Sequence, residues 1–171
     1  MELTEKERLA FINQLQILEK LYPNGKKHFR QKRTALENGF VHEYSKMTEF
    51  LYDELSKEDC EEVLNILDMY TAITSSLGEL EEGDNLHKHS FAKFKGFDGN
   101  HEGNRMSYVE YCINDLQLYK ELKMTSNGTY NSPHKMLEIY QKMFKCWKEL
   151  GKGYNLSKEQ ISTVLEASTV R

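Results

Sequence analysis

Residues 57–77, KEDCEEVLNILDMYTAITSSL, decide the fold. Their apolar side chains recur every three or four positions, which is the period of an α-helix, and Ser56 with Asp59 forms a start signal in front of them. At 100° per residue, the apolar side chains cover well over half of the helix circumference. We therefore predict a central helix that is covered on two sides. Its apolar residues are Cys60, Val63, Leu64, Ile66, Leu67, Met69, Tyr70, Ile73 and Leu77.

The helical period continues over the rest of the chain, which has two prolines and no stretch that requires a β-strand. We predict an all-α fold of about seven helices. Residues 78–90 have no periodicity and form the longest expected loop. The expected helices span residues 5–22, 26–38, 40–55, 57–77, 99–122, 133–150 and 158–167.

The segment 99–122 carries two apolar stripes, so we predict that it is the second central, widely apolar helix. Other helices of the chain or a second copy of the protein must cover both stripes, because each large side chain removed from water contributes roughly 1.5–3 kcal/mol. One stripe contains Met106, Val109, Ile113 and Leu116. The other, a candidate interaction surface, contains Tyr108, Tyr111, Leu118 and Leu122.

Length and composition favour a single folded domain over residues 1–171, with a possible subdomain break in the loop 78–97. The chain of 171 residues is 39% apolar and 29% charged, which is typical of a globular protein with a core. Lys and Arg number 23 against 27 Asp and Glu, so the formal charge of −4 gives no overall preference for nucleic acid.

Cysteine usage favours a reducing compartment. Cys60, Cys112 and Cys146 are odd in number, far apart and set among apolar neighbours, as expected of small buried side chains. The N-terminal residues carry acids and no long apolar run, and 18 uncharged apolar residues follow one another nowhere. We expect a cytoplasmic protein without a membrane span.

The acidic and glycine-rich run FDGNHEGN, residues 97–104, resembles the first half of a calcium-binding EF-hand loop. The second half does not fit, because Arg105 stands where an apolar residue is needed and Val109 where the bidentate Glu is needed. We therefore predict a helix start, with Asp98 as the N-cap, Glu102 as a favourable charge in the first turn and Phe97 packed ahead of the cap.

Two further segments carry residues that can bind ligands. His87, His89 and His101 are possible transition-metal ligands, but they lack a close-spaced partner pair, so we predict no metal site and no cofactor. The basic run KKHFRQKR, residues 26–33, is the candidate for nucleic acid, through Lys26, Lys27, Arg30 and Arg33.

Several short motifs are spread over nearly the whole chain. They are MELTEKERL at residues 1–9, LDMY at 67–70, GFD at 96–98, IYQKMFKCW at 139–147 and YNLSKEQI at 154–161. Together these motifs resemble the YfbU family of bacterial proteins. The resemblance implies a helical architecture and a cytoplasmic, bacterial protein, and it implies no established activity or catalytic residues.

The sequence contains no recognised catalytic motif, and an enzyme is the less favoured interpretation. We predict a helical interaction or regulatory protein of unknown biochemical activity that associates with itself. Ten tyrosines agree with this prediction, because Tyr suits both a core and a wet interface. The first alternative is a nucleic-acid-binding protein that uses residues 26–33. The second is an enzyme whose site assembles in space near residues 78–101.

Overall fold

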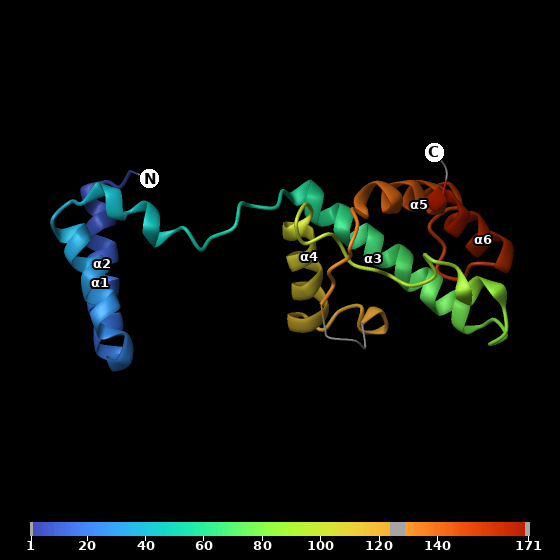
Figure 1. The fold of residues 1–171 in the computed structure, drawn as a ribbon, viewed down its shortest axis with the longest axis horizontal. Coiled ribbons are helices and arrows are strands. Elements are labelled where there is room, and N and C mark those ends of the chain that lie inside the picture. Colours follow the sequence, from blue (N-terminus) through green and yellow to red (C-terminus); the bar gives the residue numbers. More distant parts are fainter. Residues whose placement is uncertain (1, 124–128, 170–171) are drawn as a thin grey trace. The chain divides into compact units, whose positions relative to one another are not determined.

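The computed structural model describes residues 2–123 and 129–169, and the chain divides into two compact units, residues 1–53 and 54–171 (Figure 1). The candidate break at 78–97 lies inside the second unit. Over the described ranges the backbone is helical or irregular, apart from one isolated parallel β-bridge between Phe97 and Asn131. The predicted all-α fold is confirmed.

The N-terminal unit contains a helical hairpin, drawn in blue in Figure 1. Helix α1 (Glu5–Leu21) begins at Thr4, whose hydroxyl accepts the Glu7 N–H while the Glu7 carboxylate accepts the Thr4 N–H. A 3₁₀ turn, Pro23–Gly25, leads into α2 (Lys26–Glu37). Both helices agree with the predicted spans.

The helix predicted at 40–55 is wrong. Residues 51–56 form no helix, and the Thr48 hydroxyl donates to the Ser45 carbonyl at 3.2 Å, a local bond that competes with helix formation. A short helix also needs an apolar face to bury, and Leu51 remains 63% exposed in this unit. In place of the helix there are two 3₁₀ turns, Val41–Glu43 and Ser45–Met47.

The C-terminal unit is built around α3 (Lys57–Gly78), which is green in Figure 1. Helix α3 contacts all of the other three α-helices in this unit's described part, so the prediction of a central helix is confirmed. Residues buried along it include Val63, Met69 and Ile73. The three helices are α4 (Gly103–Glu110), α5 (Leu137–Glu149) and α6 (Lys158–Glu166). Shorter 3₁₀ turns are Asn85–Lys88, Lys120–Leu122 and Ala167–Thr169.

An aromatic cluster fills the middle of the C-terminal unit. The Tyr140 ring lies 5.3 to 5.5 Å from the rings of Tyr70, Phe94 and Phe97, measured between centroids. The Tyr140 hydroxyl donates to the Gly96 carbonyl at 3.0 Å, so its polar atom is satisfied within the core. Burial raises the pKa of Tyr140 far above the ordinary tyrosine value.

Gly96 allows two distant segments to meet beside this cluster. Its φ is +79°, and a side chain there would begin 1.9 Å from the Tyr130 carbonyl oxygen, so only glycine fits. The Phe97 N–H donates to that carbonyl, and the Ser132 N–H donates to the Phe97 carbonyl, each at 2.9 Å. These two hydrogen bonds hold the backbone of residues 96–97 against that of residues 130–132, and we call this contact the clasp at Gly96.

The second central helix is shorter than the predicted span 99–122. After α4, one π-helical turn (Tyr111–Asp115) ends the helix, and Gln117 and Tyr119 take left-handed conformations with φ of 56° and 51°. A tertiary hydrogen bond stabilises this non-helical backbone, since the Tyr119 hydroxyl donates to Asp68 of α3 at 3.0 Å. Among the described residues, none of the helices combines the length and the apolar character that crossing a membrane requires.

Candidate interaction site

The N-terminal unit buries few apolar side chains of its own. Among its described residues only Ala35, Leu36 and Tyr44 belong to the buried core. Polar contacts also join helix α1 to α2, since Arg8 donates to the Leu36 carbonyl from Nε at 2.9 Å and from Nη2 at 2.6 Å. A helical hairpin with so small a core is marginally stable alone, since most helical stability comes from packing an apolar face.

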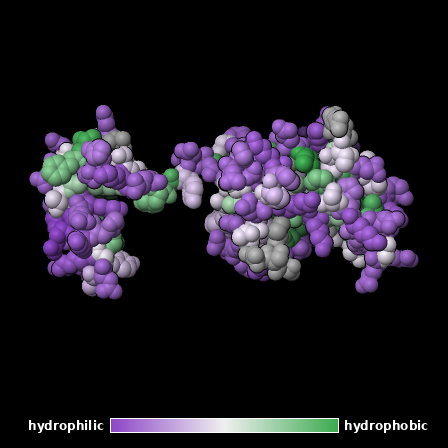
Figure 2. Space-filling view, viewed as in Figure 1, coloured by the Kyte–Doolittle hydropathy of each residue, from purple (hydrophilic) through white to green (hydrophobic). Residues whose placement is uncertain are grey.

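Large apolar side chains are exposed on the same unit. Figure 2 shows hydrophobic atoms in green at its surface, among hydrophilic ones in purple. Ten of the fourteen large hydrophobic residues that are exposed in the described structure belong to residues 1–53, although this unit is less than half as long as the other. The ten are Leu9, Phe11, Ile17, Leu21, Tyr22, Phe40, Val41, Phe50, Leu51 and Tyr52.

Helix α1 gathers several of these side chains on one face. Phe11, Ile17, Leu18 and Leu21 lie within about 120° of the helix circumference at 100° per residue. We call these four residues the α1 stripe. Phe11, Ile17 and Leu21 are 40%, 58% and 65% exposed. Such a stripe is typical of a helix that packs against another helix.

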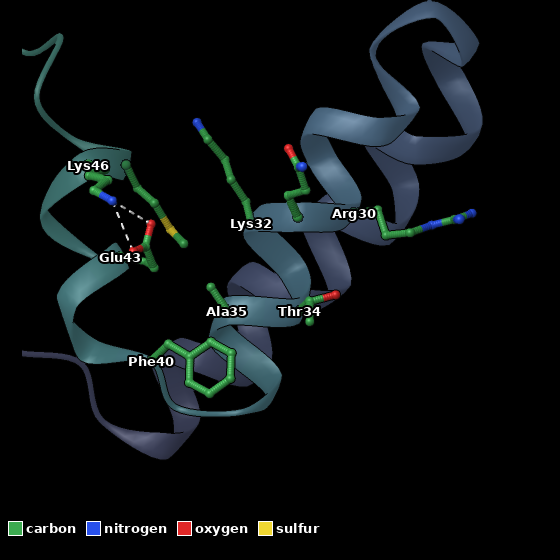
Figure 3. A pocket seen from close by; sticks show the side chains of 9 residues that line it. Arg30, Lys32, Thr34, Ala35, Phe40, Glu43 and Lys46 are labelled. Carbon is green, nitrogen blue, oxygen red and sulfur yellow. Dashed lines mark hydrogen bonds and ion pairs between the residues drawn. The ribbon is translucent and has the colours of Figure 1, made fainter.

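Two hollows adjoin in this unit and share Lys32 and Met47 in their walls. The α1 groove, about 220 Å³, is lined by apolar residues of both helices, including Phe11 and Leu18 of the α1 stripe. The α2 hollow, about 370 Å³, lies between α2 and the two 3₁₀ turns and is shown in Figure 3. The α2 hollow is lined by Arg30, Gln31, Lys32, Thr34, Ala35, Phe40, Glu43, Lys46 and Met47.

The basic residues predicted to bind nucleic acid, Lys26, Lys27, Arg30 and Arg33, lie on α2, and half of them have acidic partners. Arg33 Nε donates to Glu19 at 2.7 Å, and the Arg30 guanidinium lies 3.6 Å from the same carboxylate. The Arg33 hydrogen bond lowers the pKa of Glu19 below its ordinary value. Nucleic-acid binding through this helix stays a prediction; Lys26, Lys27 and Arg30 are exposed, and Arg33 is half-buried.

The predicted interaction stripe of Tyr108, Tyr111, Leu118 and Leu122 does not form one helical face, because the helix ends between its members. Leu122 is buried at 6% exposure, and Tyr108 is half-buried and stacks on Tyr111 at a centroid distance of 6.4 Å. Tyr111 and Leu118 are about half exposed. A small apolar patch is left where a long stripe was expected.

The predicted cap residues Phe97, Asp98 and Glu102 are placed differently from the prediction. Helix α4 starts at Gly103 and has no side-chain cap. The Asp98 carboxylate accepts a hydrogen bond from the Asn100 N–H at 2.8 Å and lies 2.6 Å from His101 Nδ1. These contacts lower the pKa of Asp98. Phe97 is fully buried in the aromatic cluster rather than packed ahead of a cap.

Glu102 is the N-terminal cap of a different helix. Its buried carboxylate accepts the N–H groups of Met136 at 3.0 Å and Leu137 at 2.9 Å, at the start of α5, and that of Asp98 at 2.9 Å. The helix predicted from residue 133 therefore starts four residues later, because this distant carboxylate supplies its cap. Sequence spacing cannot find a cap that comes from 34 residues away.

The histidines in and after the predicted loop take part in local contacts. The His87 ring nitrogen lies 3.2 Å from the Glu81 carbonyl, His89 accepts the Phe91 N–H at 3.2 Å, and His101 pairs with Asp98. Across residues 2–123 and 129–169, no three His, Cys, Asp or Glu side chains are arranged to hold a metal ion.

The candidate enzyme site near residues 78–101 consists largely of structural contacts. Asp84 accepts the Leu86 N–H at 3.0 Å and pairs with Lys158 of α6 at 2.6 Å. The Leu86 and Lys158 bonds lower the pKa of Asp84. These contacts fasten the loop to the unit, and they position no nucleophile beside a base.

The exposed apolar residues of the N-terminal unit were not predicted from the sequence, because the widest apolar arcs lie in the middle of the chain. The signal was present in α1, where Ile17 and Leu21 widen the apolar arc beyond what packing on α2 requires. The apolar run FLY, residues 50–52, was not recognised as exposed. Leu51 follows Met47 by four residues, and this spacing predicted a helix.

Comparison with known protein families supplies an independent assignment. The YfbU domain matches residues 1–167 of the 171-residue chain, so it includes both units and nearly all of their helices. The chain belongs to the YfbU family.

Proposed function

We propose that this protein is a self-associating interaction protein and that the N-terminal units of two copies form the contact. One observation carries the proposal: the described residues of the N-terminal unit, 2–53, expose ten large apolar side chains and bury only two, Leu36 and Tyr44. Exposed apolar surface of this extent, rimmed by polar residues, marks an interaction site in soluble proteins.

The α1 stripes of the two copies would pack against each other. Helices that meet through residues spaced three, four and seven apart form antiparallel or parallel pairs with interlocking side chains. Burying the four stripe residues of both copies stabilises the pair by on the order of 10 kcal/mol, which is comparable with the free-energy cost of association. The remaining exposed residues then decide the affinity.

A second copy of the N-terminal unit is the partner that we propose for this face. The described part of the C-terminal unit exposes four large apolar side chains, against ten on the described part of the N-terminal unit. A second, identical hairpin carries the same stripe. Two-fold symmetry brings this one surface patch of both copies into contact. Residues 1–53 carry nine Lys and Arg and eight Asp and Glu, so two such units do not repel strongly. The four large apolar side chains exposed on the described part of the C-terminal unit are Tyr111, Leu116, Leu118 and Tyr154.

Light scattering coupled to size-exclusion chromatography tests the proposal on the full chain. We expect twice the 20.1 kDa mass of one chain for the wild type. Leu21→Asp, in the α1 stripe, should give the monomer mass because it places a charge in the contact. Gln16→Asp, an exposed position of α1 outside the stripe, should leave the mass unchanged.

A third variant separates the two candidate surfaces. Tyr111→Asp changes the patch predicted from the sequence and lies in the C-terminal unit. If Tyr111→Asp gives monomers and Leu21→Asp does not, the contact lies on the C-terminal unit and the proposal is wrong. A wild type that stays monomeric at micromolar concentration contradicts self-association altogether.

A further inference from the structure

Residues 49–54, EFLYDE, form a segment that combines acidic and aromatic side chains. Phe50, Leu51 and Tyr52 are 68%, 63% and 84% exposed, the longest run of consecutive exposed large hydrophobic residues in the described chain. Residues 51–56 have no helical structure. Phe50 lies in a turn, which the Leu51 N–H closes by donating to the Thr48 carbonyl at 2.9 Å, and Tyr52 follows in the irregular stretch. Tyr52, the most exposed of the three, is free to contact another chain.

The α2 hollow has the complementary chemistry. In Figure 3, Ala35 and Phe40 form an apolar floor, with Lys32 on one side and the Lys46–Glu43 pair on the other. Lys46 Nζ is 2.9 Å from the Glu43 carboxylate, so Glu43 is already engaged with a cation. Arg30 also lines the outer part of the hollow and points away from that pair. Lys46 and Glu43 offset each other and Arg30 is paired with Glu19, so Lys32 carries the remaining positive charge beside the apolar floor.

We infer that the α2 hollow of one copy receives residues 49–54 of a second copy, with Tyr52 on the apolar floor and acids of the segment near Lys32 and Lys46. This inference rests on the proposed self-association through the N-terminal units. It adds a reciprocal exchange to the packing of the α1 stripes, because each copy both donates a segment and accepts one. The occupant is chosen by charge: the segment has three acids and no base.

The segment does not occupy its own hollow. Within one chain the Lys32 ammonium lies over the Phe50 ring at 5.9 Å, so the segment begins at the rim of its own α2 hollow. Tyr52 is nevertheless 84% exposed, so it does not fill that hollow. In a two-fold pair, each copy can place its own segment in the hollow of the other.

Intermolecular disulfide formation tests the inference. Tyr52→Cys and Phe40→Cys are made on separate full-length chains, one of them tagged, with Cys60→Ser and Cys146→Ser in both to remove the half-buried native thiols. The positions are 84% and 54% exposed, so both new thiols are accessible. After mixing and mild oxidation we expect a disulfide-linked dimer that contains one tagged and one untagged chain, because bridged Cβ atoms must lie within about 4.5 Å.

The control carries Tyr52→Cys and Phe40→Cys on the same chain. If the segment folds back, this protein forms an internal disulfide at monomer mass and the mixture gives no mixed dimer, which overturns the inference. A mixture that scatters light as a dimer but forms no cross-link also overturns it, and leaves the contact of the α1 stripes standing. A monomeric wild type overturns both proposals.

A variant without new cysteines gives a second measurement. Tyr52→Asp should raise the dimer dissociation constant by at least about tenfold, as expected for a buried aromatic residue at an interface, whereas Tyr52→Phe should keep it within about twofold. Sedimentation equilibrium measures both constants. Equal constants for the wild type and Tyr52→Asp would show that Tyr52 is not buried in the dimer.

Discussion

Helices α1 and α6 begin with the same local signal and differ in what surrounds them. Thr4 with Glu7 and Ser157 with Gln160 both form complete capping boxes. Helix α6 nevertheless buries Ile161, Val164 and Leu165, whereas the only buried residue of the longer α1 is Glu19. The local signal therefore decides where a helix begins, and the surroundings decide whether its apolar face is covered. In the N-terminal unit much of that face stays exposed, and we propose that a second copy covers it.

The largest expected effect comes from a matched pair of isoleucines. Ile73 in α3 is fully buried and Ile17 in α1 is 58% exposed. Ile73→Ala should lower the free energy of unfolding of the C-terminal unit by about 2–5 kcal/mol, because it leaves a cavity. Ile17→Ala should change it by less than about 0.5 kcal/mol. Urea unfolding followed by the fluorescence of Trp147, the single Trp, measures this unit.

The same pair tests the prediction of a single cooperative domain over residues 1–171. If Ile17→Ala shifts the Trp147 transition as much as Ile73→Ala does, the two units unfold together and the contrast drawn between them fails.

Glu102 gives the next effect. Glu102→Ala leaves three backbone N–H groups without their acceptor and should lower the free energy of unfolding of the C-terminal unit by about 3 kcal/mol. Glu149→Ala, an exposed position near the end of α5, is the matched control and should cost less than about 0.5 kcal/mol. Similar midpoints for the two variants in urea would mean that water replaces Glu102 at no loss.

The two capping boxes allow a direct comparison of the units. Ser157→Ala should lower the free energy of unfolding reported by Trp147 by about 1 kcal/mol. Thr4→Ala removes the equivalent cap from α1 and should leave that transition unchanged, while hydrogen exchange accelerates several-fold in the first turns of α1. A change in Trp147 unfolding upon Thr4→Ala would show that α1 stabilises the C-terminal unit.

The smallest expected effect is a pH dependence at Asp98. The Asn100 N–H and the neighbouring His101 hold the pKa of Asp98 below its ordinary value, so the charged form stabilises the folded state. That contribution is present above the unfolded pKa and is lost as pH falls through the lower folded pKa. The stability advantage of the wild type over Asp98→Asn should therefore be constant above about pH 5 and shrink below about pH 4. Trp147-monitored urea unfolding at several pH values measures it, and an advantage that does not change with pH contradicts the assignment.

Sequence reasoning located α1, α2, α3 and α6 because period and caps are local properties. It failed where a distant residue decides the outcome. Asp68 lies far along the chain from Tyr119, yet their hydrogen bond helps to end the helix that the apolar stripes predicted. Glu102 likewise sets the start of α5 from another part of the chain.

The candidate interaction site was only partly accessible to sequence reasoning. Self-association stays a prediction, and so does its location on Tyr108, Tyr111, Leu118 and Leu122. The sequence pointed there because the widest apolar arcs lie in the middle of the chain, whereas most exposed large apolar side chains lie on the N-terminal unit. Whether an apolar face is covered depends on how much of the chain packs around it, and periodicity does not report this. The exposure of Ile17 and Tyr52 became clear only when the buried set of each unit was known.

The clasp at Gly96 has a consequence for how proteins of this architecture can change in length. Because hydrogen bonds hold residues 96–97 against residues 130–132, the chain between them is a segment whose two ends are fixed to each other. Lengthening such a closed segment adds only a small entropy penalty, which grows with the logarithm of its length. Insertions should be tolerated at its solvent-facing turns, while any replacement of Gly96 itself would separate the two crossing segments.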